Sequence, residues 1–556
     1  MIVNMTTQVG LRAKIASRLP WALLCAHTAH DQRSARRWLR VAILLIVCGV
    51  GALRFVHLEA DFPNDSMWSI DQAKFTDEGW WSAAAVTHAL TGHWYVPGDY
   101  NPAAALPVWP LLLSAVFHFT GVSVIAARAL NVAISLATLG LVFVLLRRHT
   151  RSGSGVPLAA VLLLALSPFA FVFSRLAILD SLVIFEFCLS LWVASFATSR
   201  RIWPLAILSV LVSLMLLTKT TSALLIPSVF WLAWSAMGRK TSAFLRVALA
   251  VAIVPAALTR GYAALVWAMG YGADYRYFFS RNALDDFDWS QSLDTLVELG
   301  RNCLSIDRVL YPVVLVILVL TLVWKRKLWS NSLFAASWLA LAGQACFIFR
   351  LQDDYAPRYF LVMLAPIVLI VALTLDELLA DARAIPIPPN PEAGMSEPVL
   401  PSEGRHSNKG LAGLNPFWNR SSVAAVLLLS AMAASATING VMIEQFVAHP
   451  QRQFYDAANS IRKIVRSDPE QNQVISGVSG SQISLMTGIP CINDAHGPQE
   501  RAANDQPGWF LAWADLSSDA TARFSAFRLE EVASYPVFDD PGRTPLILFK
   551  MVRRVQ

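Results

Sequence analysis

Long apolar runs, separated by short charged loops, recur along most of this chain and constrain its fold more than any other feature. An α-helix needs about 20 mostly apolar residues to cross a bilayer. Runs of roughly this length lie at residues 39–57, 124–146, 155–173, 181–198, 202–217, 221–237, 247–268, 308–324, 332–349, 358–376 and 421–440. Only 15% of the 556 residues are charged, whereas soluble domains average about 25%. We therefore predict an all-α polytopic membrane protein with about 11 transmembrane helices.

Positively charged residues gather in the loops that follow every second apolar run. Four such loops, which together hold 11 Lys/Arg and no Asp or Glu, are residues 147–155, 199–201, 238–246 and 325–330. The first 41 residues add seven Lys/Arg. Because basic loops stay on the cytoplasmic side, the pattern predicts a multi-pass protein of the cytoplasmic (inner) membrane with a cytoplasmic N-terminus. The net charge of +7 follows from this topology and does not indicate nucleic acid as a partner.

One further apolar stretch, residues 103–121, is ambiguous by length alone. If it crossed the membrane, all four basic loops would lie outside while the basic N-terminus stayed inside, against the positive-inside rule. The stretch also contains Pro107 and Pro110. We therefore predict an interfacial or re-entrant helix on the outer face.

This topology divides the chain into five parts. They are a cytoplasmic segment (1–38), a transmembrane module (39–379) with outer loops 58–123 and 270–307, a flexible cytoplasmic linker (380–420), a last transmembrane helix (421–440) and an extracytoplasmic domain (441–556). The linker prediction follows from its many Pro, Gly, Ser and Asn residues. The last part is predicted to be a small α/β domain. The prediction rests on helical periodicity at 452–466, on a helix in SQISLMTG that ends at Gly488, and on strand patterns in QVISGV and PLILFKMV.

Charged residues stand out at four places beside the apolar runs on the predicted outer face. They are Asp77-Glu78, Asp180, Lys219 and the segment 350–359, and a charge placed at a membrane without evident need is a functional candidate. Each also has a structural explanation. Asp77 and Asp180 can cap helices, Lys219 can extend its amine to the interface, and the Arg and Tyr residues of 350–359 can anchor a helix end.

Taken together, these residues suggest one kind of chemistry. An acid can remove the proton of an incoming hydroxyl group, and cations can hold a phosphate leaving group on a lipid carrier. Both outer loops are acidic and aromatic: residues 58–105 carry seven Asp/Glu and one Lys, and residues 270–307 carry seven Asp/Glu and three Arg.

The order of these features resembles the polyprenyl-phosphate-sugar-dependent glycosyltransferases of the protein O-mannosyltransferase and aminoarabinose transferase type, which share the GT-C fold. The resemblance covers residues 40–380 and rests on Asp77-Glu78 followed by ALTGHWYVPGDYNP, LALSPFAFVFSRLAILDSL, LLTKTT and PRYFLVMLAPIVLIVAL. It implies that Asp77 is the catalytic acid group that activates the acceptor and that Asp180 supports it. It also implies that Lys219, Arg358 and Tyr359 lie near the lipid phosphate.

The chain departs from that family at two places. Where many relatives have Glu-Lys-Pro, this chain has Tyr100-Asn101-Pro102, so the metal-ligating Glu and the phosphate-contacting Lys are missing. The later outer loop of relatives often supplies a His, but residues 270–307 of this chain contain none. Arg281 lies in this loop and is a candidate to replace the missing cation. No metal site can be assigned. If a divalent ion binds to Asp77 and Asp180, carboxylate ligands favour Mg or Mn.

The main hypothesis is an inverting glycosyltransferase that moves a hexosyl or pentosyl group from a polyprenyl-phosphate donor to an acceptor hydroxyl on the outer face. The acceptor, a glycolipid, a polysaccharide or a protein, is left open. The catalytic candidates are Asp77, Glu78 and Asp180, and the substrate-binding candidates are Lys219, Arg358, Tyr359, Arg175, Asn101 and Arg281. Two alternatives are a transporter or flippase of lipid-linked sugars, which would place polar groups near the bilayer midplane, and a non-catalytic membrane scaffold.

Overall fold

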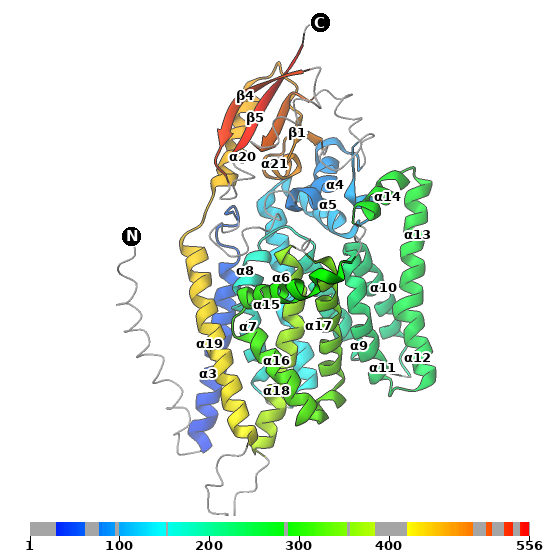
Figure 1. Ribbon diagram of the computed structural model, residues 1–556, viewed down its shortest axis with the longest axis vertical. Coiled ribbons are helices and arrows are strands. Elements are labelled where there is room, and N and C mark those ends of the chain that lie inside the picture. The colour runs from blue at the N-terminus through cyan, green and yellow to red at the C-terminus, as the bar shows by residue number, and fades with distance from the viewer. Residues whose placement is uncertain are drawn as a thin grey trace, which may run out of the picture.

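The computed structural model describes most of the transmembrane module and much of the C-terminal domain. The described residues are 29–61, 77–94, 99–151, 154–198, 200–282, 287–352, 356–383, 420–492, 507–513, 527–537 and 545–554. Residues 1–28 of the predicted cytoplasmic segment and 384–419 of the predicted linker lie outside this part. A bundle of long helices forms one end of the molecule, and a small sheet with two helices forms the other (Figure 1).

Each predicted apolar run is helical. The helices are α3 (Ala29–Leu53), α6 (Val124–His149), α7 (Val156–Ala165), α8 (Pro168–Phe173), α9 (Asp180–Ala194), α10 (Trp203–Thr218), α11 (Ile226–Ala236), α12 (Thr241–Ala248), α13 (Val254–Ala268), α16 (Leu310–Val323), α17 (Ser332–Leu351), α18 (Leu361–Arg383) and α19 (Arg420–Ala448). Within the described residues, five helices are by themselves long and apolar enough to cross a membrane, or six if one bent pair counts as a single span. A multi-pass membrane protein is thus confirmed, while the number of 11 spans stays a prediction.

One predicted span is broken into two helices, and one junction between predicted spans has an extended backbone. The run 155–173 forms two helices because Ser167 caps α8, accepting a hydrogen bond from the backbone N–H of Ala170, and Pro168 follows at the first helical position. The run of α10 stops at Lys219, whose backbone is extended (φ −158°, ψ 125°), before a short 3-10 helix η3 (Thr220–Leu225). This junction falls between the predicted spans 202–217 and 221–237 and separates Lys219 from the regular turns of both helices.

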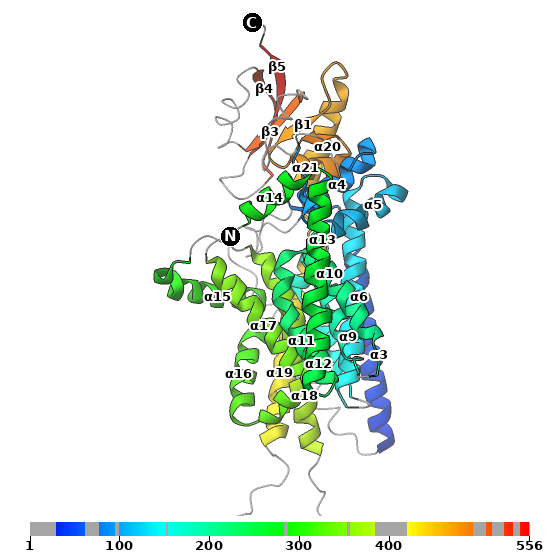
Figure 2. The same cartoon turned by 90° about the vertical axis from the view of Figure 1, so that its right-hand side faces the viewer.

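The core of the bundle is built around α18. This helix is buried along nearly its whole length and packs against α6, α7, α9, α16, α17 and α19. Its sequence is apolar on every face, as a helix surrounded by others requires. The helix α15 (Ser292–Ile306) belongs to the bent pair, which turns by 116° where α16 begins. Figure 2 shows α15 directed away from the bundle.

The predicted first outer loop folds onto the end of the bundle next to the sheet. Its helices α4 (Asp77–Thr91) and α5 (Val108–Thr120) pack against each other and lie between the bundle and the C-terminal domain (Figures 1 and 2). With 13 residues, α5 is too short to span a bilayer. Trp109 and Leu113 of α5 are fully buried and share a core with α4. The short length and the packing of α5 support the prediction of an interfacial or re-entrant helix in 103–121.

The C-terminal domain is an α/β fold, as predicted. Its elements are α20 (Gln453–Ser467), β1 (Ile475–Gly477), α21 (Gly480–Thr487), β2 (Cys491–Ile492), β3 (Trp509–Trp513), β4 (Phe527–Tyr535) and β5 (Leu546–Arg553). The sheet has the order β2-β1-β3-β5-β4, with β1 parallel to its two neighbours and β5 antiparallel to both of its own. Gly488 ends α21 in a left-handed conformation (φ +70°), which glycine adopts without strain.

Candidate active site

Asp77 is the first residue of α4 and forms an ion pair with Arg358. The distance between Asp77 Oδ2 and Arg358 Nη2 is 2.5 Å, and the side chains are 16% and 13% exposed. Arg358 lies on a short 3-10 helix, η7 (Pro357–Phe360), directly before α18. Pro357 favours this start because its fixed φ suits the first helical position. The partial exposure leaves both groups within reach of a ligand.

Asp180 and Lys219 form the second ion pair of the site. Lys219 Nζ lies 2.6 Å from Asp180 Oδ1, and the side chains are 13% and 3% exposed. Asp180 is the first residue of α9, whose N-cap position is occupied by Leu179 without a side-chain cap. The structure therefore favours an ion pair over the capping role considered for Asp180, and over the interfacial role considered for Lys219.

The ring of Tyr359 joins the two ion pairs. Its centre lies 4.8 Å from Lys219 Nζ and 5.4 Å from Arg358 Cζ. Both distances are within the range of cation–π attraction. Two carboxylates and two cations from four separate parts of the chain thus lie together beside one aromatic ring.

Glu78 points to a different place from Asp77. Its side chain is fully buried, and both carboxylate oxygens accept hydrogen bonds from Arg128 at 2.8 and 2.6 Å. The backbone N–H of Ala177 and the amide of Gln482 complete its partners at 2.8 and 3.1 Å. A buried, fully bonded carboxylate of this kind holds structure together and offers no atom to a substrate. We therefore assign Glu78 to the support of the site.

Asn101 is engaged in a backbone turn. Its side chain accepts a hydrogen bond from the N–H of Ala103 at 2.9 Å and donates one to the carbonyl of Trp94 at 2.7 Å. The preceding residue, Tyr100, is buried beside the ring of Trp80, and this burial raises the pKa of its hydroxyl. At the position of the family's Glu-Lys pair, this chain therefore has a neutral, packed turn.

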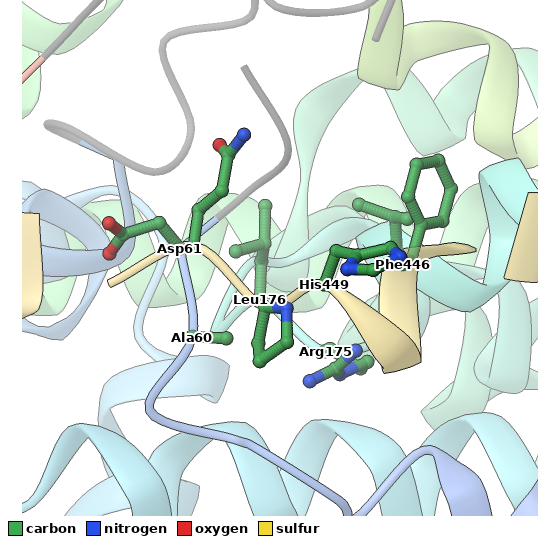
Figure 3. Close-up of a pocket in the computed structure, with 9 residues that line it drawn as sticks. Ala60, Asp61, Arg175, Leu176, Phe446 and His449 are labelled. Atoms are coloured by element: carbon green, nitrogen blue, oxygen red, sulfur yellow. The ribbon is translucent and has the colours of Figure 1, made fainter. Parts of the chain in front are cut away.

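Arg175 lies at the junction between the first helix and α19. Its guanidinium donates to the carbonyls of Val56 and His57 at 2.7 and 2.6 Å. It lines a small pocket together with Asp61 and His449 (Figure 3). These contacts assign Arg175 to the anchoring of the first outer loop. Arg281 is the last residue of α14 (Gly272–Arg281), and its side chain lies outside the described part of the structure.

The residues present do not fit the family's metal site. Among the described residues, no three His, Cys, Asp or Glu side chains converge as metal ligands do. Tyr100, which stands at the position of the family's ligand Glu, has no carboxylate and is buried beside the ring of Trp80.

An open cavity of about 1310 Å³ lies beside Lys219. It is lined by Thr220 next to that lysine and by two arginines, Arg260 on α13 and Arg276 on α14, together with apolar and aromatic side chains. The cation of Arg276 stacks on Trp267 at 4.9 Å from the ring centre. A cavity with cations and apolar walls at a membrane boundary suits an amphipathic anion.

Two residues of the site's support were not among those predicted from the sequence. One is Arg128, the partner of Glu78, and its signal was present because it is a charged residue within the apolar run 124–146. The other is Gln482, which lies 404 positions from Glu78 in the chain. A neutral residue so far away carries no local signal.

The described residues thus form a polytopic helical bundle with a loop folded over its end and paired charges beneath a small α/β domain. The family model for dolichyl-phosphate-mannose-protein mannosyltransferase matches residues 101–259. The resemblance predicted from the sequence is therefore confirmed.

Two solved structures share the fold over almost the entire chain. The crystal structure of ArnT from Cupriavidus metallidurans bound to undecaprenyl phosphate has a TM-score of 0.54 and 16% identity, covering 93% of this chain and 98% of that one. The apo structure of the same ArnT has a TM-score of 0.54 and 13% identity, with the same coverage. No curated protein matches the sequence.

Proposed function

We propose that this protein is an inverting glycosyltransferase of the cytoplasmic membrane, which moves a sugar from a polyprenyl-phosphate donor to an acceptor hydroxyl on the outer face. The observation that carries the proposal is the meeting of Asp77–Arg358 and Asp180–Lys219 around Tyr359. The fold shared with ArnT, whose crystal structure contains undecaprenyl phosphate, supports the class of donor.

Asp77 is the general base in this proposal. It takes the proton of the acceptor hydroxyl while the oxygen forms a bond to the anomeric carbon of the sugar. The bond from that carbon to the phosphate oxygen breaks, and the phosphate leaves with the electron pair. Attack from the side opposite to the phosphate inverts the anomeric configuration. General base catalysis of this kind contributes about 10²–10⁴-fold in rate.

Lys219 and Arg358 stabilise the negative charge of the leaving phosphate. In the structure each of them is bonded to a carboxylate. A phosphate entering between the pairs offers the cations a second, stronger acceptor. Arg358 then turns from Asp77 toward the phosphate, and Asp77 gains a lone pair for the acceptor proton. The arginines of the adjacent cavity provide further positive charge along the path of the donor.

The test uses the full-length protein reconstituted in proteoliposomes. Undecaprenyl phosphate should bind directly, as measured by native mass spectrometry or thermal shift, and Lys219→Ala should weaken that binding. A panel of undecaprenyl-phosphate-linked hexoses and pentoses, offered with glycolipid, polysaccharide and peptide acceptors, should then give a glycosylated product. NMR spectroscopy of the product should show the inverted anomer.

The same assay separates this function from its main alternative. A flippase would move the intact lipid-linked sugar between leaflets and leave it unconsumed. Translocation without transfer to any acceptor, together with normal binding of undecaprenyl phosphate, would overturn the glycosyltransferase proposal.

A further inference from the structure

A glutamine of the C-terminal domain contacts the turn that carries Asp77. Gln482, on α21, is completely buried. Its Oε1 accepts a hydrogen bond from the backbone N–H of Gly79 at 2.6 Å, and its Nε2 donates one to Glu78 Oε2 at 3.1 Å. Glu78 and Gly79 directly follow Asp77 in α4. One side chain of the second domain therefore holds the first turn of the helix on which Asp77 lies.

Gly79 allows the two helices to approach within backbone contact. A Cβ atom at this position would lie 2.2 Å from the backbone nitrogen of Gln482 and 2.4 Å from the carbonyl carbon of Ser481. These distances are far below any van der Waals contact, so only glycine fits here. The start of α4 is thus packed directly against α21, with no side chain between them to absorb a shift.

Glu78 extends this contact to the second ion pair. Its Oε1 accepts a hydrogen bond from the N–H of Ala177 at 2.8 Å, and Ala177 lies three residues before Asp180. Its Oε2 is shared between Arg128 and Gln482. The same carboxylate therefore links the starts of α4 and α9, and Gln482 satisfies its remaining acceptor site. The relative position of Asp77 and Asp180 depends on this set of bonds.

We propose that Gln482 is a positioning residue for Asp77, and that the C-terminal domain is a part of the active-site framework. The inference rests on the proposed role of Asp77 as the base. Glutamine suits the position because it presents an acceptor and a donor at the same distance from the helix, one for the Gly79 N–H and one for the Glu78 carboxylate. A displacement of about 1 Å at a catalytic group can cost 10²-fold in rate.

The experiment compares Gln482→Leu with the wild-type full-length protein in the transfer assay with an undecaprenyl-phosphate-linked sugar. Leucine keeps much of the buried volume and removes both hydrogen bonds. We expect kcat to fall by about 10–100-fold while KM for the donor stays within about twofold, since Lys219 and Arg358 are untouched. Hydrogen–deuterium exchange should become faster in the peptide that contains Gly79, because its N–H loses its acceptor.

The matched control is Gln471→Leu. Gln471 belongs to the same domain, and its amide donates to the carbonyls of Gly508 and Met551 at 3.0 and 2.9 Å. The Gln471→Leu variant loses a comparable pair of hydrogen bonds within the domain, and none of them involves α4. Its kcat and the exchange of the Gly79 peptide should equal those of the wild type.

A second variant, Gln482→Glu, tests the same bonds with a titratable group. The introduced carboxyl can accept from Gly79 in either form, but it can donate to Glu78 only when protonated. The charged groups around it are Glu78 and Arg128. The ratio of variant to wild-type kcat should therefore rise as the pH falls. This variant also decides the question if Gln482→Leu fails to fold.

A wild-type kcat in both variants, with unchanged exchange at Gly79, would overturn the inference. A lower melting temperature with unchanged kcat would also overturn it, because it assigns Gln482 a purely structural role. A wild-type protein without any transfer activity would instead overturn the proposed function. In that case faster exchange in Gln482→Leu would still support the control of the α4 start by the C-terminal domain.

Discussion

At the scale of single residues, two neighbours in the chain have opposite roles. Asp77 is partly exposed and paired with Arg358, whereas Glu78 is fully buried and paired with Arg128. A helix turns successive side chains about 100° apart, so one of the pair faces the open site and the other the interior. The rate of transfer and the stability of the fold should therefore respond to different members of this pair.

Asp77→Asn keeps the size of the side chain but removes the basic oxygen. We expect a loss of roughly 10²–10⁴-fold in kcat with folding intact, which is the usual contribution of a general base. Steady-state kinetics and thermal unfolding measure the two effects separately. The matched control is Asp294→Asn, which changes an exposed acid in the first turn of the outer-loop helix α15, and its turnover should be normal.

Glu78→Gln has a different expected effect. Removing one member of a buried, hydrogen-bonded ion pair costs about 3–5 kcal/mol, so this variant should unfold at a lower temperature or fold poorly. If Asp77→Asn keeps its activity, or if the two variants lose kcat equally with equal stability, Asp77 is not the base.

Lys219→Ala should weaken binding of the donor more than Lys219→Arg does. Arginine retains the positive charge but not the compact ammonium, so it should restore part of the affinity. Binding of undecaprenyl phosphate and the apparent KM of its sugar derivative measure the effect. Lys327→Ala, at an exposed lysine of the 3-10 helix Arg326–Ser330, should change neither quantity. Unchanged donor binding in Lys219→Ala would contradict the assignment.

Removal of divalent ions with a chelator tests whether the transfer activity needs a metal ion. Because Tyr100 replaces the ligand Glu of the family and residues 270–307 contain no His, we expect EDTA to leave most of the transfer activity in place. A loss of activity that Mg²⁺ or Mn²⁺ restores would contradict this expectation and would point to Asp77 and Asp180 as ligands.

At the scale of elements, the first outer loop caps a helix of the C-terminal domain. The carboxylate of Asp61 accepts hydrogen bonds from the N–H groups of Phe454 and Tyr455, at 2.8 and 3.3 Å, at the start of α20. The residue at the N-cap of α20, Arg452, supplies no side-chain cap of its own. A carboxylate from another segment thus satisfies donors that a helix start always leaves open.

Asp61→Ala should therefore destabilise the docking of α20. The loss of a cap costs about 0.5–2 kcal/mol, which denaturant unfolding followed by a probe in the C-terminal domain would detect. Asp61→Asn retains one acceptor oxygen and should lose less. Equal stability of the alanine variant and the wild type would mean that α20 is held by its packing alone.

At the scale of the whole molecule, the topology predicts which parts of the chain reach the cell exterior. In a cysteine-free background, single thiols placed in 58–102, 270–307 and 445–556 should react with a membrane-impermeant reagent in intact cells. Thiols in 147–155 and 325–330 should react only after permeabilisation. A labelled 147–155 loop would mean that 103–121 crosses the membrane, and the proposed site would then lie on two different sides.

The sequence by itself determined the class of the molecule and the position of most of its helices. Long apolar runs have few stable solutions other than membrane helices. The amphipathic helix α20 follows from its local periodicity, and the end of α21 follows from the glycine at 488. It also indicated Asp77, Asp180, Lys219 and Arg358, because charges are rare beside such runs.

Only the tertiary structure decided which of these charges meet and what each of them does. Asp180 and Lys219 are 39 positions apart in the chain, and the partners Asp77 and Arg358 are much further apart. Glu78 has a structural role because α6 places Arg128 next to it. Gln482 contacts Glu78 because α21 packs against Gly79. Such partners are selected by packing between distant elements, and the local periodicity of each element does not record which other element it will meet.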